Sequence, residues 1–120
     1  MCGDSEEKEA YRPTFTKERL DQIESKMLEF MHFVADRNGG GLPSCFQPCG
    51  RILNNIQICK EHDYANMEEL TYVVQSDWYA TQDPLRGLNS FTVPCDSLQE
   101  RVEFNNTYAN YIKDLEFLIK

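Results

Sequence analysis

The sequence lacks a long apolar run. A transmembrane helix needs about 18 or more consecutive apolar residues, and no stretch of the 120 residues comes near that length. Hydrophobic residues nevertheless make up 41% of the chain, which is too many for a disordered acidic chain. The composition therefore predicts one globular domain that does not enter a membrane.

Positive charge is also scarce. The chain has 12 Lys and Arg residues against 20 Asp and Glu residues, for a net charge of −8, and it has no cluster of basic residues. Phosphate backbones and anionic membrane surfaces would repel such a chain. We therefore expect neither nucleic acid nor a membrane as a partner.

Signatures of catalysis and metal binding are missing as well. Only two histidines occur, and no glycine-rich phosphate loop, calcium loop or oxyanion motif accompanies them. Cys45, Cys49, Cys59 and His62 are four potential zinc ligands, but on one helix Cys49 and Cys59 would lie about 15 Å apart. Zinc ligands all lie within about 2.3 Å of the metal. We expect no enzyme, no metal and no cofactor.

Helical periodicity dominates what is present, and strand-like alternation is absent. Apolar residues recur at spacings of three and four in four segments. Thr14 or Thr16 can cap the first, whereas Asn66 with Glu69, and Ser97 with Glu100, have the spacing of a capping box. The predicted helices cover about 16–37, 44–60, 66–83 and 97–120. The prediction is an all-α fold, a four-helix bundle.

The segments between and before these helices complete the predicted organisation. Residues 83–94, DPLRGLNSFTVP, contain two prolines and a glycine, so they are predicted to form a long crossover loop before the last helix. Residues 1–13, MCGDSEEKEAYRP, are predicted to be a mobile acidic tail. Residues 14–120 then form a single helical-bundle domain.

The last predicted helix carries two apolar seams, which together cover about 200° where a surface helix needs about 100°. The first contains Leu98, Val102, Ala109, Ile112 and Ile119, and the second contains Phe104, Tyr108, Tyr111, Leu115 and Leu118. One interpretation is a central helix packed by two neighbours. The other is that the second seam binds another chain or a second copy of this one.

The third predicted helix adds two tyrosines to this candidate surface. Tyr72 and Tyr79 lie seven residues apart, on the side opposite Met67, Leu70, Val74 and Trp78. Residues 61–83 contain six acids and no Lys or Arg, so a basic partner could use this face; the alternative is a solvated surface. The predicted partner-binding residues are Tyr72, Tyr79, Phe104, Tyr108, Tyr111, Leu115 and Leu118.

Five cysteines are unusual for a chain of this size. Cys2 lies in the predicted tail, Cys45, Cys49 and Cys59 share a helical stripe with Ile52 and Ile56, and Cys95 precedes the last helix. The four later cysteines can be small core residues, or Cys95 can form a disulfide with one of the others. The choice depends on the compartment: cytoplasmic if Met1 is the native start, secreted if the chain is a mature fragment.

These patterns favour one function and leave an alternative. The favoured one is a non-enzymatic protein–protein interaction module, an adaptor or regulatory domain, which binds through the third and fourth helices. The alternative is a secreted, disulfide-stapled four-helix ligand. The predicted arrangement loosely resembles short-chain helical cytokines. The shared features are the long first and last helices, the long crossover and the positions of the cysteines.

Overall fold

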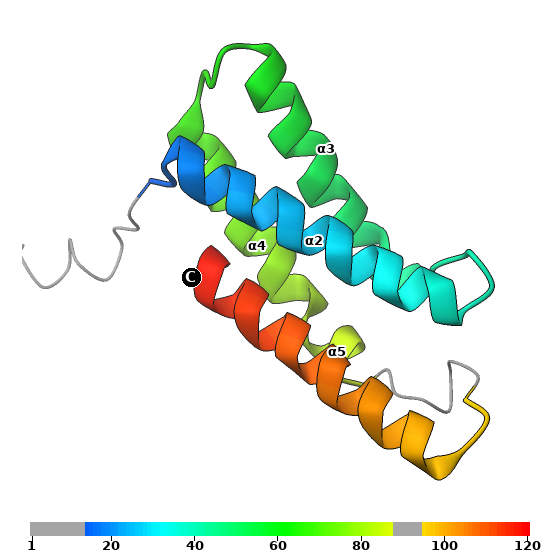
Figure 1. The fold of residues 1–120 in the computed structure, drawn as a ribbon. Coiled ribbons are helices and arrows are strands. Elements are labelled where there is room, and N and C mark those ends of the chain that lie inside the picture. The colour runs from blue at the N-terminus through cyan, green and yellow to red at the C-terminus, as the bar shows by residue number, and fades with distance from the viewer. Residues whose placement is uncertain (1–13, 88–94) are drawn as a thin grey trace, which may run out of the picture.

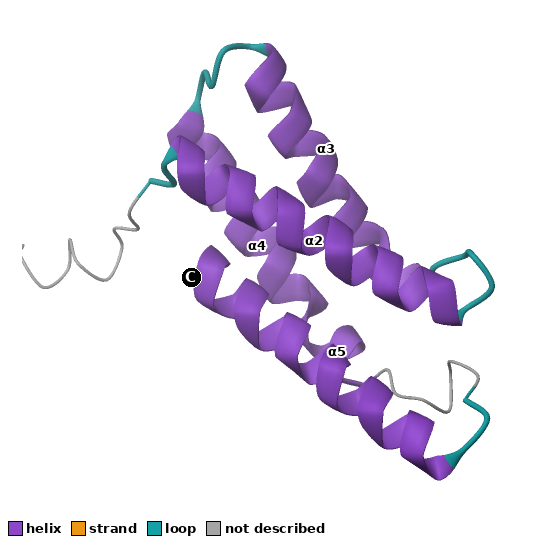
Figure 2. Cartoon of the chain, in the orientation of Figure 1, coloured by secondary structure: helices purple, strands orange, loops and turns teal. Residues whose placement is uncertain are grey.

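Helices form nearly all of the part of the chain that this computed structural model describes, residues 14–87 and 95–120 (Figure 1). The elements are α2 Lys17–Arg37, the 3-10 helix η1 Ser44–Phe46, α3 Gln47–Glu61, α4 Met67–Gly87 and α5 Leu98–Ile119. No strand occurs within the described residues (Figure 2). The predicted all-α bundle is confirmed; the predicted tail, 1–13, lies outside the described residues.

Side-chain caps start α2 and α5 where the sequence places them. The Thr16 hydroxyl accepts a hydrogen bond from the Arg19 N–H at 3.0 Å, and the Ser97 hydroxyl accepts one from the Glu100 N–H at 3.1 Å. The Glu100 carboxylate accepts from the N–H of Asp96, at 2.7 Å, one residue before the cap. These bonds satisfy donors that a helix leaves unpaired at its N-terminus.

The start of α4 agrees with the prediction in position but not in geometry. Asn66 has a φ of 60°, whereas an N-cap residue is extended. Two residues before it in the same turn also have positive φ, Asp63 at 60° and Tyr64 at 62°. A non-glycine residue at positive φ is strained. The Tyr64 N–H compensates by donating to the Cys59 carbonyl at 2.7 Å, so the α3–α4 turn is closed by backbone hydrogen bonds.

The predicted loop 83–94 requires a correction. Helix α4 continues through Pro84 to Gly87, although proline removes one backbone hydrogen bond of a helix. Leu85 explains the extra turn, since its side chain is fully buried and its carbonyl accepts a 2.6 Å hydrogen bond from the Tyr108 hydroxyl. Tertiary contacts thus outweigh the local preference. Residues 88–94, and with them the crossover, lie outside the described residues.

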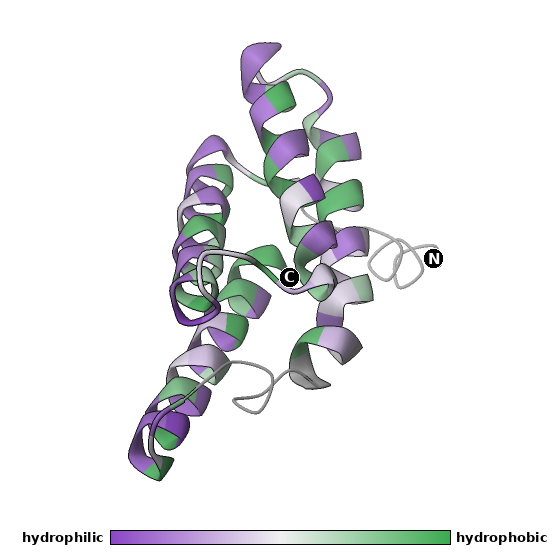
Figure 3. Cartoon of the chain, turned by 90° about the vertical axis from the view of Figure 1, so that its right-hand side faces the viewer, coloured by the Kyte–Doolittle hydropathy of each residue, from purple (hydrophilic) through white to green (hydrophobic). Residues whose placement is uncertain are grey.

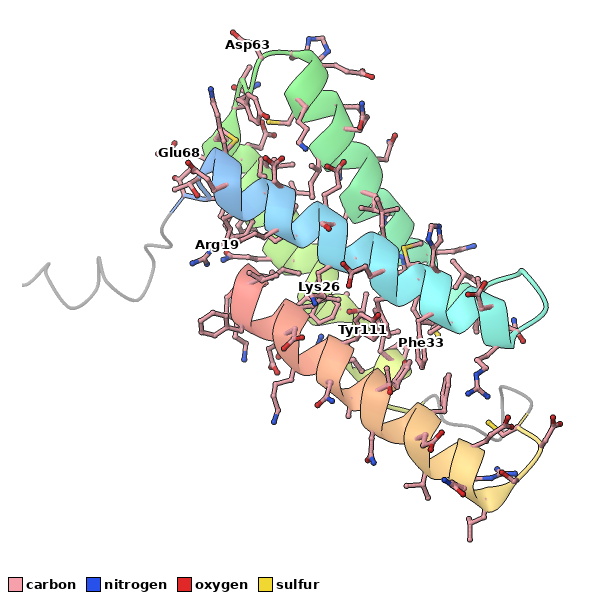
Figure 4. All side chains as sticks on the ribbon, in the orientation of Figure 1. Arg19, Lys26, Phe33, Asp63, Glu68 and Tyr111 are labelled. Carbon is pink, nitrogen blue, oxygen red and sulfur yellow. The ribbon has the colours of Figure 1, made fainter. Side chains whose placement is uncertain are left out.

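Helices α2 and α5 pack antiparallel along their lengths. Arg19 donates to the Leu118 carbonyl near one end, Phe30 contacts Tyr108 and Tyr111 in the middle, and Arg37 lies 3.8 Å from Glu100 at the other end. Figure 4 shows Phe33 and Tyr111 between the two helices. Helices α2 and α5 therefore form one aromatic layer.

Helices α3 and α4 form an antiparallel hairpin. Ion pairs join the hairpin to α2 and also join its two helices to each other. Lys60 at the end of α3 lies 2.6 Å from both Asp21 and Glu24 of α2. Arg51 and Asp77 bridge α3 and α4 at 3.7 Å. Phe46 of η1 packs on Phe30 with ring centroids 5.3 Å apart. The hairpin thereby covers the side of α2 that α5 leaves open.

The core lies between these two helix pairs. Figure 3 shows apolar and polar stretches alternating along each helix, as expected for amphipathic helices. The largest fully buried side chains of the core include Phe30, Phe46 and Phe104. Helix α5 extends past the end of α4, because Tyr108, near the middle of α5, already meets the last turn of α4. Leu98 and Val102, in the projecting part, are accordingly 75% and 49% exposed.

Candidate protein-binding surface

The aromatic seam of α5, predicted to bind a partner, is an intrachain packing surface. Phe104, Tyr108 and Leu115 are 5% exposed or less, and Phe33 stacks on Phe104 at 5.0 Å. Tyr111 and Leu118 are half-buried and pack against the same core. Helix α2 packs against this seam, so Phe104, Tyr108 and Leu115 are buried within the chain.

Tyr108 makes both ring contacts and a hydrogen bond within the chain. Its ring lies 5.2 Å from that of Phe30 and 5.7 Å from that of Phe104, and its hydroxyl donates to the Leu85 carbonyl. Burial, followed by the nearby Cys45 and Cys49, raises the pKa of the Tyr108 hydroxyl above its usual range. The group therefore stays protonated and serves as a structural donor.

The four cysteines within the described residues are free thiols. Cys49 and Cys59 are buried, while Cys45 and Cys95 are half-buried. Burial, followed by the charge of Cys45, raises the pKa of Cys49 to about 12, and burial also raises the pKa values of Cys45 and Cys59. Because the thiolate is the reactive form, these shifts lower the reactivity of the three thiols.

The surroundings of Cys59 and the placing of possible metal ligands can be described directly. Cys59 donates to the Ala65 carbonyl at 3.4 Å and lies 3.6 Å from the Met67 sulfur, so its thiol already has partners. Across residues 14–87 and 95–120, no three His, Cys, Asp or Glu side chains are placed to hold one metal ion.

Tyr72 and Tyr79 have the opposite environment to the α5 seam. They are 65% and 81% exposed, on the side of α4 away from its buried Leu70, Val74 and Trp78, as the spacing predicted. Glu68, Glu69, Ser76 and Ala80 are exposed on the same helix. We call these six residues the α4 outer face: Glu68, Glu69, Tyr72, Ser76, Tyr79 and Ala80.

The charge around this face has one sign. Residues 61–83 contain six acids and no Lys or Arg. Arg51 of α3 forms an ion pair with Asp77, at 3.7 Å, on the flank of α4; Glu68 and Glu69 form no ion pair within the described part of the chain. Two exposed phenol rings thus share one helix face with two carboxylates that form no ion pair within the described residues.

A groove between α3 and α4 borders the α4 outer face, and sequence reasoning missed it. It has a volume of about 450 Å³, and its lining includes Ile58 of α3, His62 directly after that helix, and Glu69, Leu70 and Val73 of α4. Ile58 is 44% exposed. The available signal was that Ile58 falls outside the stripe formed by Ile52, Ile56 and the cysteines, so an apolar side chain was left on the outer side of α3.

Comparison of the chain with protein-family models, with curated proteins and with solved structures found no match. No helix within the described residues is long and apolar enough to cross a membrane.

Proposed function

We propose that this protein is a non-enzymatic interaction module whose α4 outer face binds a basic, amphipathic surface of another protein. The observation that supports this most directly is the exposure of Tyr72 and Tyr79, at 65% and 81%. Two large rings on one helix face, within an acidic surround, are costly to leave in water and well suited to an interface. Tyrosine is enriched among the residues that dominate binding energy.

The carboxylates and the rings have different tasks in this proposal. Glu68 and Glu69 attract a partner with exposed Lys or Arg, and such complementary charge mainly raises the association rate. Tyr72 and Tyr79 then supply the apolar area that holds the complex together. The α4 outer face therefore selects its partner by two properties, positive charge and an apolar surface.

The groove beside Glu69 adds a place for one side chain. Its volume of about 450 Å³ and the half-exposed Ile58 and Val73 on its walls suit an aliphatic residue of the partner. A partner helix that carries apolar residues on one side and cations on the other would place both kinds at once. We propose such a helix as the partner segment, in the helix-in-groove mode of recognition.

A titration with a defined probe tests the proposal. The probe is a helical peptide with leucines on one face and lysines on the other, and fluorescence anisotropy gives its dissociation constant. We expect saturable binding that Tyr72→Ala/Tyr79→Ala weakens by about tenfold or more, since hot-spot residues each contribute over about 1 kcal/mol. This variant keeps every charge, so its loss measures the aromatic contribution alone.

A matched pair of variants separates the face from general acidity. Glu68→Gln/Glu69→Gln and Asp36→Asn/Glu103→Gln each remove two exposed carboxylates. We expect only the first pair to weaken the probe. Equal loss in both pairs, or unchanged affinity in the tyrosine variant, would show that the probe senses net charge and would contradict the proposal.

A further inference from the structure

An aromatic ring lies between two lysines on the outer side of α5. Lys113, Phe117 and Lys120 follow one another at spacings of four and three residues, so they share one helix face. All three are exposed, and Phe117 is 79% exposed. We call these three residues the α5 outer stripe. A phenylalanine in this position does not contribute to the core, and phenylalanine is enriched where proteins bind one another.

The α5 outer stripe borders two hollows along the seam between α2 and α5. One has a volume of about 730 Å³ and is lined also by Phe15 and Arg19, and the other has a volume of about 690 Å³ and is lined also by Lys26. Lys113 and Phe117 line both hollows, and no residue of α3 or α4 lines either. Side chains of a second molecule therefore have room on each side of the Phe117 ring.

The stripe is positively charged, although the chain as a whole is acidic. Lys113 forms no ion pair within the described residues. Lys120 lies 2.9 Å from Glu116, but its side chain is 71% exposed, and such exposed pairs are weak. Arg19, labelled in Figure 4, donates from one nitrogen to the Leu118 carbonyl at 3.1 Å and has further N–H donors. This surface therefore fits a partner with exposed carboxylates.

The α4 outer face has the complementary pattern. It combines the exposed rings of Tyr72 and Tyr79 with the carboxylates of Glu68 and Glu69. Its two tyrosines lie seven residues apart, as do the two lysines of the α5 outer stripe, and seven residues span about 10 Å of helix at 1.5 Å per residue. Two helices laid side by side therefore present rings and charges at matching intervals. Lysine is favourably placed over a tyrosine ring as well as beside a carboxylate.

We propose that the α5 outer stripe of one copy of the chain binds the α4 outer face of a second copy. This inference rests on the binding role proposed above for the α4 outer face, and it names the chain itself as a source of the basic, apolar surface which that face requires. The stripe's lysines pair with Glu68 and Glu69, and Phe117 packs between Tyr72 and Tyr79.

The contact joins two different surfaces, so it is heterologous, or head-to-tail. The α5 outer stripe and the α4 outer face share no residue and lie on different helices. A contact of a few side chains is small and transient, and the net charge of −8 opposes the approach of two copies. We therefore expect association with a dissociation constant between about 1 μM and about 1 mM.

Sedimentation velocity of the full chain, over protein concentrations from about 1 μM to about 1 mM, tests this inference. The weight-average mass is expected to rise with concentration above the 14.0 kDa of one copy. Lys113→Glu/Lys120→Glu and Glu68→Lys/Glu69→Lys each give a chain whose two surfaces have the same sign of charge, so each variant is expected to stay monomeric. Phe117→Ala is expected to weaken association by about tenfold, because it removes the central ring of the contact.

A charge swap separates this contact from a general effect of charge. The two reversed variants carry complementary surfaces when they are mixed in equal amounts, and so does one chain that carries all four substitutions; both samples are expected to associate again. Asp36→Lys/Glu103→Lys is the matched control, because it changes the net charge as much as Glu68→Lys/Glu69→Lys does but at exposed sites elsewhere. It should leave association intact.

The outcomes distinguish this inference from the proposed function. A wild-type chain that stays monomeric at every concentration overturns the inference, and if it still binds the lysine–leucine probe, the proposed function stands. Association that persists in Lys113→Glu/Lys120→Glu, or a mixture of two folded reversed variants that stays monomeric, would also overturn the inference. Circular dichroism establishes that the variants are folded. Saturating probe should dissociate the wild-type assembly, because both bind the α4 outer face.

Discussion

Helices α4 and α5 carry aromatic residues at similar helical spacings, yet the two sets have opposite environments. Tyr108 and Phe104 of α5 are 5% and 1% exposed, whereas Tyr72 and Tyr79 of α4 are 65% and 81% exposed. The difference lies in the facing helix. Opposite α5, α2 offers Phe30 and Phe33 at centroid distances of 5.0 to 5.5 Å; nothing within the described residues covers the α4 outer face.

This comparison separates the aromatic residues that stabilise the fold from those that do not. A buried aromatic side chain contributes about 3 kcal/mol or more to folding, while a largely exposed one contributes little until a second surface covers it. The α2–α5 layer therefore holds the fold, and the α4 outer face is free to change without unfolding the chain. Substitutions in the two regions should therefore differ in their effect on the free energy of unfolding.

The largest expected loss comes from the α2–α5 layer. Phe30 is fully buried and contacts the rings of Phe46, Tyr108 and Tyr111. Phe30→Ala should lower the free energy of unfolding by about 3–5 kcal/mol, measured by urea denaturation. Phe117→Ala, at a ring that is 79% exposed, is the control and should change it by less than about 0.5 kcal/mol. Similar values for the two variants would contradict the comparison.

Alkaline pH should lower the free energy of unfolding through buried groups of the core. Burial raises the pKa of Cys49 from its ordinary 9.0 to about 12, so above pH 9 the unfolded chain loses this proton while the folded chain keeps it. Stability is then fully present below pH 9 and falls as pH rises toward 12, by up to about 1.4 kcal/mol per pH unit for this group. Tyr108, whose pKa burial also raises, acts in the same direction above its ordinary value of 10.0.

Thermal unfolding at several pH values measures this effect, and Cys49→Ala is the matched variant. It should show a smaller fall in Tm between pH 9 and the onset of tyrosine ionisation. If wild-type and variant lose stability in parallel over that range, the thiol of Cys49 does not differ between folded and unfolded chain, and the account of its burial fails.

A single hydroxyl gives the next smaller effect. Tyr108→Phe removes the 2.6 Å hydrogen bond to the Leu85 carbonyl and should lower the free energy of unfolding by about 1–2 kcal/mol. Tyr111→Phe is the neighbouring control, because the Tyr111 ring packs on Phe30 and Phe33 without a hydrogen bond from its hydroxyl in the described structure. Its change should stay below about 0.5 kcal/mol. Denaturant titration of both variants decides the question.

The smallest effect on folding belongs to the α4 outer face. Tyr72→Ala and Tyr79→Ala should each change the free energy of unfolding by less than about 0.5 kcal/mol, because both rings are largely in water. Tyr79→Ala should have the smaller effect of the two. A loss above about 2 kcal/mol in either variant would show that the ring packs within the chain and would remove the α4 outer face as a binding surface.

Helical periodicity predicted the four helices and the position of Tyr72 and Tyr79 on the side of α4 away from its apolar stripe, because both follow from local spacing. The sequence also predicted the Thr16 and Ser97 caps, which are local bonds. It failed at Pro84, where a hydrogen bond from Tyr108, on α5, supports the last turn of α4. It failed at Asn66 as well, where the backbone adopts positive φ in a turn closed by Cys59.

The candidate site could be predicted only in part, for the same reason. Two apolar seams on α5 were visible in the sequence, but which of them faces α2 depends on how two helices far apart in the chain pair. The α3–α4 groove likewise exists only once Ile58 and Val73 are brought together. The enclosed or open state of an aromatic stripe is a property of the pairing, and one helix alone does not encode it.

Mapping the lysine–leucine helical probe by ¹H–¹⁵N NMR tests the central claim most directly. The account predicts that the largest signal changes fall on the α4 outer face, at Tyr72, Ser76 and Tyr79, with smaller ones at Ile58 beside the groove, and that Tyr108 and Leu115 of the buried seam stay unchanged. Changes spread evenly over the acidic residues of all four helices, or concentrated on α5, would contradict it.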